Sequence, residues 1–344
     1  IFRLGNAYLD LVIETSQGIN PTNLQDRRTG RLYADADYIY RLTPELSKRP
    51  TYQQHRIRTL KDGSKEVTVI GKLGPVQLEH RFRVSPEKPY IEEQITLANT
   101  GREELDTSQL AFGFAKRLKK SVGEWVDGLE RCRLVAVPYR REFQGKHGEY
   151  EDYSFDDLLS RGGWYRARWN APKITTPQFG SEGWTWTDGD MGLLIVKHNK
   201  EAMEFSLVEP VSQLSILRFG GAGIWKLGDP EVALTLKPSQ RLTFGITRYI
   251  LFEGGWKGGY YAFREFMEEI GHGYPKDFDP PVHWNELYDN PLWWGQDTPE
   301  RRQQFYKMAD MEQEAMKARE LGCEALYLDP GWDTSFASSI WAED

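Results

Sequence analysis

The stretch Val76-Gln77-Leu78-Glu79-His80-Arg81-Phe82-Arg83-Val84 decides the fold of most of this chain, because apolar or aromatic residues alternate with polar ones along all of it. Successive side chains of a strand point to opposite faces, so this pattern predicts a strand with one face on a core and one in water. The same alternation returns on both sides, at Leu9, Leu11 and Ile13 and at Ile91, Ile95 and Leu97 around Glu93.

Such runs recur from Gly5 to about Phe252 and are separated by turn-forming residues such as Asp62-Gly63 and Asn99-Thr100-Gly101. Many strands with almost no long helical pattern predict a large antiparallel β-sandwich. The exception is the segment from Tyr139 to Asn170, which is rich in Arg, Asp, Tyr and Gly and is interpreted as a long loop.

The size and composition of the chain exclude several classes of protein. A length of 344 residues predicts two domains, and no apolar run reaches the roughly 18 residues of a membrane helix. A net charge of -7 argues against nucleic acid as a partner. The chain opens at Ile1 without a signal-peptide pattern, which suggests that the true start is missing. The compartment stays open, with a secreted or periplasmic location favoured over a cytoplasmic one.

The hydrophobic period changes from that of strands to that of helices after Gly258-Gly259. Apolar residues then recur at helical spacing up to Ile270, which predicts a closing helix over 259–270. Asp279-Pro280-Pro281 stiffens the chain after it, because proline fixes its own φ and restricts the residue before it. We therefore expect one domain over 1–278 and a second over 279–344.

The second domain is expected to begin with a strand, a helix and a strand. Val282-His283-Trp284-Asn285 is short and strand-like, and Thr298 followed by Pro299 is a good start for a helix that Gly322 would end. The apolar run from Cys323 to Leu328 is typical of a buried strand. Residues 282 to 328 therefore predict one βαβ unit, the beginning of a parallel sheet.

The residues just after each of these two strands are the candidates for chemistry, since parallel α/β folds bind ligands at the carboxyl ends of their strands. Trp284, Asn285, Glu286 and Tyr288 lie at the end of the first strand, and Asp329, Trp332 and Asp333 follow the second. A carboxylate accepts hydrogen bonds from hydroxyls and an indole stacks on a pyranose, so the pairing of Asp329 with Trp332 suits a sugar.

The stretch from 282 to 332 also resembles the start of the catalytic barrel of the melibiases, the α-galactosidase family called glycoside hydrolase family 36. That resemblance is carried by Val-His-Trp-Asn-Glu-Leu-Tyr and by Ala-Leu-Tyr-Leu-Asp-Pro-Gly-Trp, and Phe219 to Trp225 and Leu242 to Tyr249 look like the end of its sandwich domain. The resemblance implies a multidomain β plus α/β protein. Its parts would be a large antiparallel β-supersandwich and then the start of a (β/α)8 TIM barrel.

Four residues of this chain correspond to substrate-binding positions of that family. Asp329 matches the first of two aspartates that hold ring hydroxyls of the terminal sugar, and Trp332 matches the tryptophan that closes the same motif. Trp284 resembles the tryptophan that lines the pocket after the first strand, and Trp341 a further aromatic wall. Pro330 stands where the second aspartate would be.

The resemblance further implies a retaining exo-α-glycosidase of α-galactosidase type that needs no cofactor and no metal. Its substrate would be an oligosaccharide or glycoconjugate with a terminal α-linked sugar. The resemblance also implies that the protein could form a homo-oligomer. The nucleophile and the acid/base residue are expected beyond Asp344, and Asp329 and Asp333 lie too close together on one loop to be that pair. The alternatives are a carbohydrate-binding sandwich protein without activity and a transglycosylase of the same clan.

The remaining motifs of the sandwich favour structural roles. The six histidines show no spacing suited to zinc, and His80 is interpreted as a core residue. The acidic residues Glu151, Asp152, Asp156 and Asp157 favour a solvated loop over a calcium site. A sugar-binding wall remains an alternative to core packing for the tryptophans Trp164, Trp169, Trp184 and Trp186.

Overall fold

The computed structural model describes residues 1–107, 110–137, 152–161, 179–181, 183–199, 203–225, 235–289, 300 and 306–329. The chain divides into two compact units, Ile1–Gly273 and Tyr274–Asp344. This division falls five residues before the boundary that we placed after residue 278. No helix in the described part of the chain is long and apolar enough to cross a membrane.

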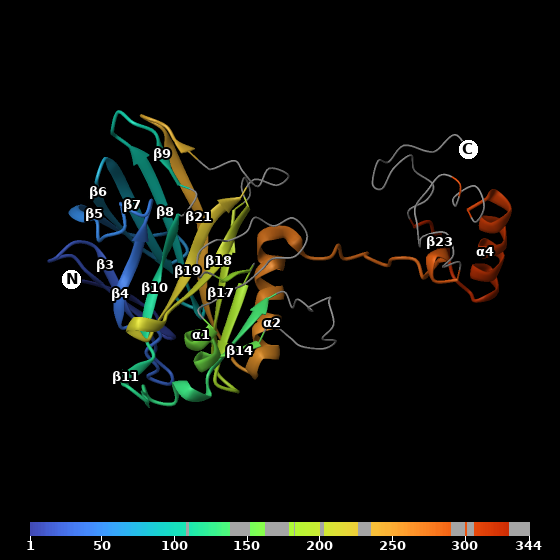
Figure 1. The fold of residues 1–344 in the computed structure, drawn as a ribbon, viewed down its shortest axis with the longest axis horizontal. Coiled ribbons are helices and arrows are strands. Elements are labelled where there is room, and N and C mark those ends of the chain that lie inside the picture. Colours follow the sequence, from blue (N-terminus) through green and yellow to red (C-terminus); the bar gives the residue numbers. More distant parts are fainter. Residues whose placement is uncertain are drawn as a thin grey trace. The chain divides into compact units, whose positions relative to one another are not determined.

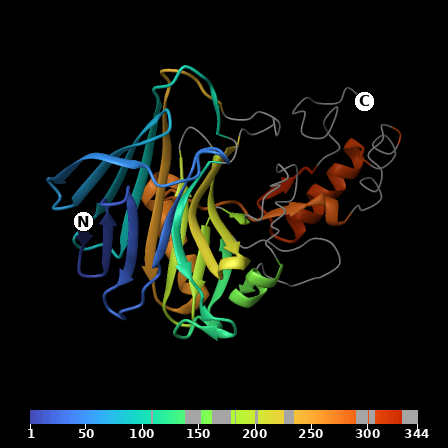
Figure 2. The same ribbon diagram turned by 60° about the vertical axis from the view of Figure 1, so that its left-hand side comes forward.

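The first unit is built on two antiparallel sheets (Figures 1 and 2). Within the described residues, the larger sheet has nine strands in the order β14 (Asp152–Ser154), β13 (Arg133–Val137), β16 (Gly183–Thr187), β17 (Gly192–His198), β21 (Arg241–Phe252), β8 (Tyr90–Asn99), β7 (Val76–Val84), β6 (Lys65–Leu73) and β5 (Thr51–Thr59). The smaller has the order β15 (Phe179–Ser181), β18 (Met203–Val211), β19 (Ile216–Trp225), β10 (Ala111–Arg117) and β4 (Ala36–Arg41).

Shorter elements complete this unit. They are β1 (Phe2–Gly5), β2 (Leu9–Glu14) and β3 (Asn20–Asp26) in one sheet, the pairs β11 (Lys119–Ser121) with β12 (Glu124–Trp125) and β9 (Leu105–Asp106) with β20 (Thr235–Leu236), and the 3-10 turns η1 (Leu129–Arg131) and η2 (Ser212–Leu214).

The core of the unit lies between the two large sheets. Phe114 of β10 meets Tyr249 of β21 with ring centroids 5.0 Å apart, and Phe112 meets Phe244 at 5.4 Å. Along β7, alternate residues are buried from Val76 to Val84, as the sequence pattern predicts. The predicted antiparallel sandwich is therefore confirmed.

The closing helix α2 (Gly255–Met267) begins four residues before the predicted start at 259 and continues into the π-helical turn η3 (Glu268–His272). Gly258 and Gly259 lie inside this helix. Neighbouring atoms come too close to either residue for a side chain to fit there. A Cβ at Gly258 would lie 1.7 Å from the Glu253 carbonyl oxygen, and one at Gly259 would lie 2.1 Å from Thr185 Cγ2. The helix thus packs on the outer face of the nine-stranded sheet, where Phe266 joins Val196 and Ile250.

Part of the predicted long loop is regular structure. Its residues 152–161 form β14 and the helix α1 (Phe155–Arg161). The hydroxyl of Ser154 accepts a hydrogen bond from the Asp157 N–H at 3.1 Å, and the Asp157 carboxylate accepts one from that hydroxyl at 2.7 Å. This reciprocal cap begins the helix, and it occupies one of the carboxylates that we considered for calcium.

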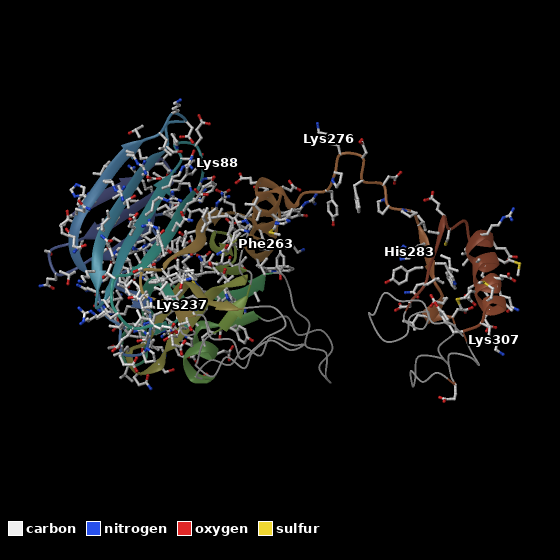
Figure 3. The ribbon with its side chains drawn as sticks, turned by 90° about the horizontal axis from the view of Figure 1, so that it is seen from above. Lys88, Lys237, Phe263, Lys276, His283 and Lys307 are labelled. Carbon is white, nitrogen blue, oxygen red and sulfur yellow. The ribbon has the colours of Figure 1, made fainter. Side chains whose placement is uncertain are left out.

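The second unit contains the predicted βαβ unit. Strands β22 (His283–Asn285) and β23 (Ala325–Tyr327) pair in parallel, with Trp284 opposite Leu326, and the turn η4 (Glu286–Tyr288) and the helix α4 (Met308–Glu320) lie between them in the chain. His283 and Lys307, labelled in Figure 3, mark the start of β22 and the residue before α4.

One continuous helix from Thr298 to Leu321 is not found. The backbone of Lys307 is extended, with φ −99° and ψ 160°, and its N–H donates to the Asp310 carboxylate at 3.1 Å. This contact stabilises a new helix start at Met308, since a carboxylate three residues into a helix can satisfy the cap N–H. Thr298 itself lies outside the described residues.

Candidate functional site

The candidate site lies at the carboxyl ends of the parallel strands β22 and β23. The pair ends with Asn285 opposite Tyr327, so the residues that follow each strand emerge at the same edge of the sheet. Asn285 and Glu286 come from the end of β22 and Asp329 from the end of β23. Ligands of parallel α/β folds bind at this edge, where loops leave the strands.

Asp329 is held at three of its polar groups. Its carboxylate Oδ2 accepts a hydrogen bond from Asn285 Nδ2 at 2.9 Å, and its backbone N–H donates to Glu286 Oε1 at 3.0 Å. The Tyr306 hydroxyl donates to its carbonyl oxygen at 3.4 Å. No donor among the described residues reaches Oδ1, and the side chain is half-buried. Among the described residues, Oδ1 is thus the carboxylate oxygen of Asp329 that is left without a donor.

The amide of Asn285 has only one orientation that satisfies both of its contacts. Its Oδ1 accepts the N–H of Leu287 at 2.9 Å, which closes a short turn after β22. Because that oxygen is occupied, the NH2 group must face Asp329. Asn285 therefore fixes the rotation of the Asp329 carboxylate.

Glu286 is completely buried although it carries a carboxyl group. Burial raises the pKa of this carboxyl; the hydrogen bonds from backbone N–H groups and the neighbouring Tyr306 hydroxyl oppose the rise, and the charge of Asp329 adds to it. Oxygen Oε1 binds the Asp329 N–H, whereas Oε2 has no hydrogen-bond partner in the described structure. Glu286 thus links the end of β22 to the backbone of Asp329.

The indole N–H of Trp284 is bound to α4 and not to Asp329. Its indole N–H donates to Glu314 Oε2 of α4 at 2.8 Å, so its polar edge is held against the helix. Glu314 also binds Lys317 at 2.6 Å, and Lys317 in turn pairs with Asp289. The aromatic residues Trp332 and Trp341, and Pro330, lie outside the described residues.

The chemistry available at this edge is hydrogen bonding to hydroxyl donors. A carboxylate oxygen can accept hydrogen bonds from sugar hydroxyls, and a charged acceptor makes a stronger bond than a neutral one. No group of three or more metal-ligating side chains occurs among the described residues. Asn285 and Glu286 were named from the sequence as strand-end residues but not as site residues, because only the parallel register shows that they reach Asp329.

The tryptophans of β16 belong to the core and do not form a sugar-binding wall. Trp184 and Trp186 are completely buried. The Trp184 N–H donates to the Ser206 carbonyl oxygen at 3.1 Å, and Trp186 packs edge-on against Tyr33 and Phe155 with ring centroids 5.0 and 5.1 Å away. Trp164 and Trp169 lie outside the described residues.

His80 is a core residue, as we predicted, and it belongs to a buried polar cluster. Its Nε2 lies 2.7 Å from Glu93 Oε1, and its Nδ1 lies 2.7 Å from the Tyr40 hydroxyl. Glu93 also accepts hydrogen bonds from the hydroxyls of Tyr38 and Tyr249. Both ring nitrogens are therefore occupied by protein groups, which leaves none for a metal.

The structure is similar to those of α-galactosidases of glycoside hydrolase family 36. AgaB from Geobacillus stearothermophilus has a TM-score of 0.57 at 12% identity, over 96% of this chain and 49% of that chain. AgaA from the same organism has 0.54 at 12%, over 96% and 50%. The α-galactosidase of Lactobacillus brevis has 0.53 at 11%, over 96% and 48%. Variants of AgaA were crystallised with raffinose and with stachyose.

These similarities establish a shared fold. Each of them covers only part of the length of the neighbouring protein. At 12% identity or below the similarity shows the fold alone, and the chain spans about half the length of the α-galactosidases that it matches. No family model and no curated protein matches the sequence. The chain thus has the fold of the N-terminal β-sandwich of these enzymes.

Proposed function

We propose that the protein to which this chain belongs is a retaining exo-α-glycosidase of α-galactosidase type, acting on terminal α-linked sugars. In this proposal the chain supplies the sandwich and the first loops of the sugar site. The observation that carries the proposal is Asp329, held at the carboxyl end of β23 with Oδ1 free of the described residues. The shared fold over 96% of the chain supports it.

Asp329 would bind the sugar and would not perform the chemistry. Retaining hydrolysis needs two carboxyl groups about 5 to 5.5 Å apart, one on each side of the anomeric carbon. In the described site the second carboxyl group, Glu286, is bound to the backbone of Asp329 and so lies on the same side. We therefore place the nucleophile and the acid/base residue elsewhere in the protein, as the family resemblance implies.

Two of the other predicted substrate-binding residues keep that role in the proposal, and one changes it. Trp332 and Trp341 would supply the aromatic surface for the C–H face of the sugar. Trp284 would act indirectly, by fixing α4 against β22 through its hydrogen bond to Glu314. A homo-oligomer and a secreted or periplasmic location stay predictions.

The ligands of the neighbours support a choice of first substrate. Because variants of AgaA were crystallised with raffinose and stachyose, we propose an oligosaccharide with a terminal α-linked galactose as the first substrate to test. Pro330 offers no carboxylate where the family has its second aspartate, so the test includes other sugars.

The experiment is turnover of nitrophenyl α-glycosides by the full-length protein, with galactoside, N-acetylgalactosaminide, glucoside and L-arabinopyranoside as substrates and β-galactoside as the control. We expect release from the α-galactoside, with retention of configuration followed by NMR. Release from another α-glycoside alone would make Pro330 the residue that changes the sugar specificity. Transfer of the sugar to an added sugar acceptor in place of water, with less free sugar formed while nitrophenol release is maintained, would indicate a transglycosylase. Sugar binding without release from any glycoside would contradict the proposal and favour a binding protein.

A further inference from the structure

Glu286 is an unusual side chain of the second unit, because it is a completely buried carboxyl group with one oxygen that no described residue binds. Burying an unpaired polar atom costs free energy, so a buried Glu in this position requires a compensating contact. The Tyr306 hydroxyl neighbours this carboxyl group, and the Asp329 backbone N–H donates to its Oε1 at 3.0 Å. That contact joins residues 43 positions apart in the chain.

The contact lies beyond the last paired residues of the two strands. The ladder of β22 and β23 ends at Asn285 and Tyr327, so it does not itself fix the backbone at Asp329. Tyr306 reaches the Asp329 carbonyl oxygen at 3.4 Å, which is long for a hydrogen bond. Of the two hydrogen bonds that described side chains make to the Asp329 backbone, the one to Glu286 is therefore the shorter.

We infer that Glu286 is a positioning residue, which fixes the backbone of Asp329 through Oε1 and thereby sets where the free oxygen Oδ1 meets a sugar hydroxyl. Asn285 fixes the rotation of the carboxylate, and Glu286 fixes the position of the residue that carries it. The role in sugar binding rests on the proposed function, whereas the restraint on the backbone does not.

The role depends on an acceptor atom at the position of Oε1 and not on negative charge. The raised pKa of Glu286 agrees with this, because burial already favours the neutral form of the group. Glu286→Gln keeps a carbonyl oxygen for the Asp329 N–H, while Glu286→Ala removes it. Glu286→Asp keeps the carboxyl group but moves the acceptor oxygen back by one methylene. This variant replaces Glu286→Ala in both experiments if the alanine variant does not fold.

The first readout is independent of activity. Amide hydrogen exchange of the peptide 325–329 is followed by mass spectrometry in the full-length protein. We expect Glu286→Ala to speed exchange about tenfold or more, the size expected from loss of one hydrogen bond to a charged or buried group, and Glu286→Gln to change it less than about threefold. Glu312→Ala is the control for a Glu-to-Ala change in this unit, because Glu312 is exposed on α4, and it should leave the exchange unchanged.

The second readout is the kinetics of the preferred glycoside. Glu286→Ala should raise KM about tenfold to a hundredfold with a smaller change in kcat, because it misplaces a binding group, and Glu286→Gln should restore both. Unchanged exchange and kinetics in Glu286→Ala, or equal damage by Gln and Ala, would overturn the inference. If the wild-type protein cleaves no glycoside, the proposed function fails while the exchange experiment still decides the role of Glu286.

Discussion

Replacement of Glu93 by Ala should destabilise the sandwich more than any single change on its surface. Glu93 is 2% exposed and accepts hydrogen bonds from Tyr38, Tyr249 and His80, with the last two at 2.8 and 2.7 Å. Truncation leaves these three donors without an acceptor between the two sheets. Each buried unpaired group costs about 1 to 3 kcal/mol, and breaking a buried charged contact costs about 3 to 5 kcal/mol, so we expect a loss of at least about 4 kcal/mol.

Glu93→Gln removes the carboxylate but keeps an acceptor oxygen, so it separates two contributions to the loss of stability: the missing acceptor and the missing carboxylate. Its amide oxygen can still accept from Tyr38 and His80 on the Oε1 side, and the Tyr249 hydroxyl can rotate to accept from its NH2 group. We expect this variant to lose about 1 to 2 kcal/mol.

The assay is urea unfolding of the whole chain, followed by tryptophan fluorescence. The slope of the unfolding free energy against urea concentration is compared between variants. Glu79→Ala is the matched control, since Glu79 lies on the outer face of the same sheet and pairs with the exposed Arg56 and Arg241. That control should lose less than about 1 kcal/mol. A loss below about 1 kcal/mol for Glu93→Ala, or one no larger than for Glu93→Gln, would refute the reasoning.

Three further predictions concern single sites. Lys197 and Glu204 form a completely buried ion pair at 2.7 Å, so Lys197→Met should cost about 3 to 5 kcal/mol in urea unfolding, and adding Glu204→Gln should recover most of that loss; an additive double variant would contradict the pairing. Trp186→Ala should lose about 3 to 5 kcal/mol, and iodide should not quench Trp186 fluorescence in the folded chain, whereas efficient quenching would place this side chain at the surface. Burial raises the pKa of Glu286 above its ordinary value of 4.5, so the folded state loses stability as the pH rises and the group must ionise. The thermal stability of Glu286→Gln relative to the wild type should therefore increase from about pH 4.5 upward. A difference that stays constant with pH would show that the pKa of this carboxyl is not perturbed.

Side-chain alternation predicted the strands and their inward faces, because it depends only on local geometry. Ile91, Ile95 and Leu97 of β8 are buried as expected, and Glu93 lies on the same face. The alternation could not show why a carboxylate is stable there, since Tyr38 is 55 residues away and belongs to the opposite sheet. Pairing between sheets is set by the topology, which a strand pattern does not contain.

The candidate site was predictable in part for a similar reason. The order strand, helix, strand implied a parallel pair, and that pair brings Asn285 within hydrogen-bonding distance of Asp329, 44 positions away. Trp284 precedes Asn285 by one position, and the sequence alone gave no sign that its indole would bind Glu314 of α4. The start of α4 at Met308 depended on a contact between Lys307 and Asp310 that helix periodicity could not show.

The most direct test of the proposed sugar site is the effect of Asp329→Ala on turnover of the preferred α-glycoside by the full-length protein. Loss of a hydrogen bond to a charged group costs about 1.5 to 3 kcal/mol, so kcat/KM should fall about tenfold to a hundredfold, while the unfolding of the sandwich unit stays unchanged. An unchanged kcat/KM in a folded variant would show that Asp329 does not bind the sugar and would contradict the central claim.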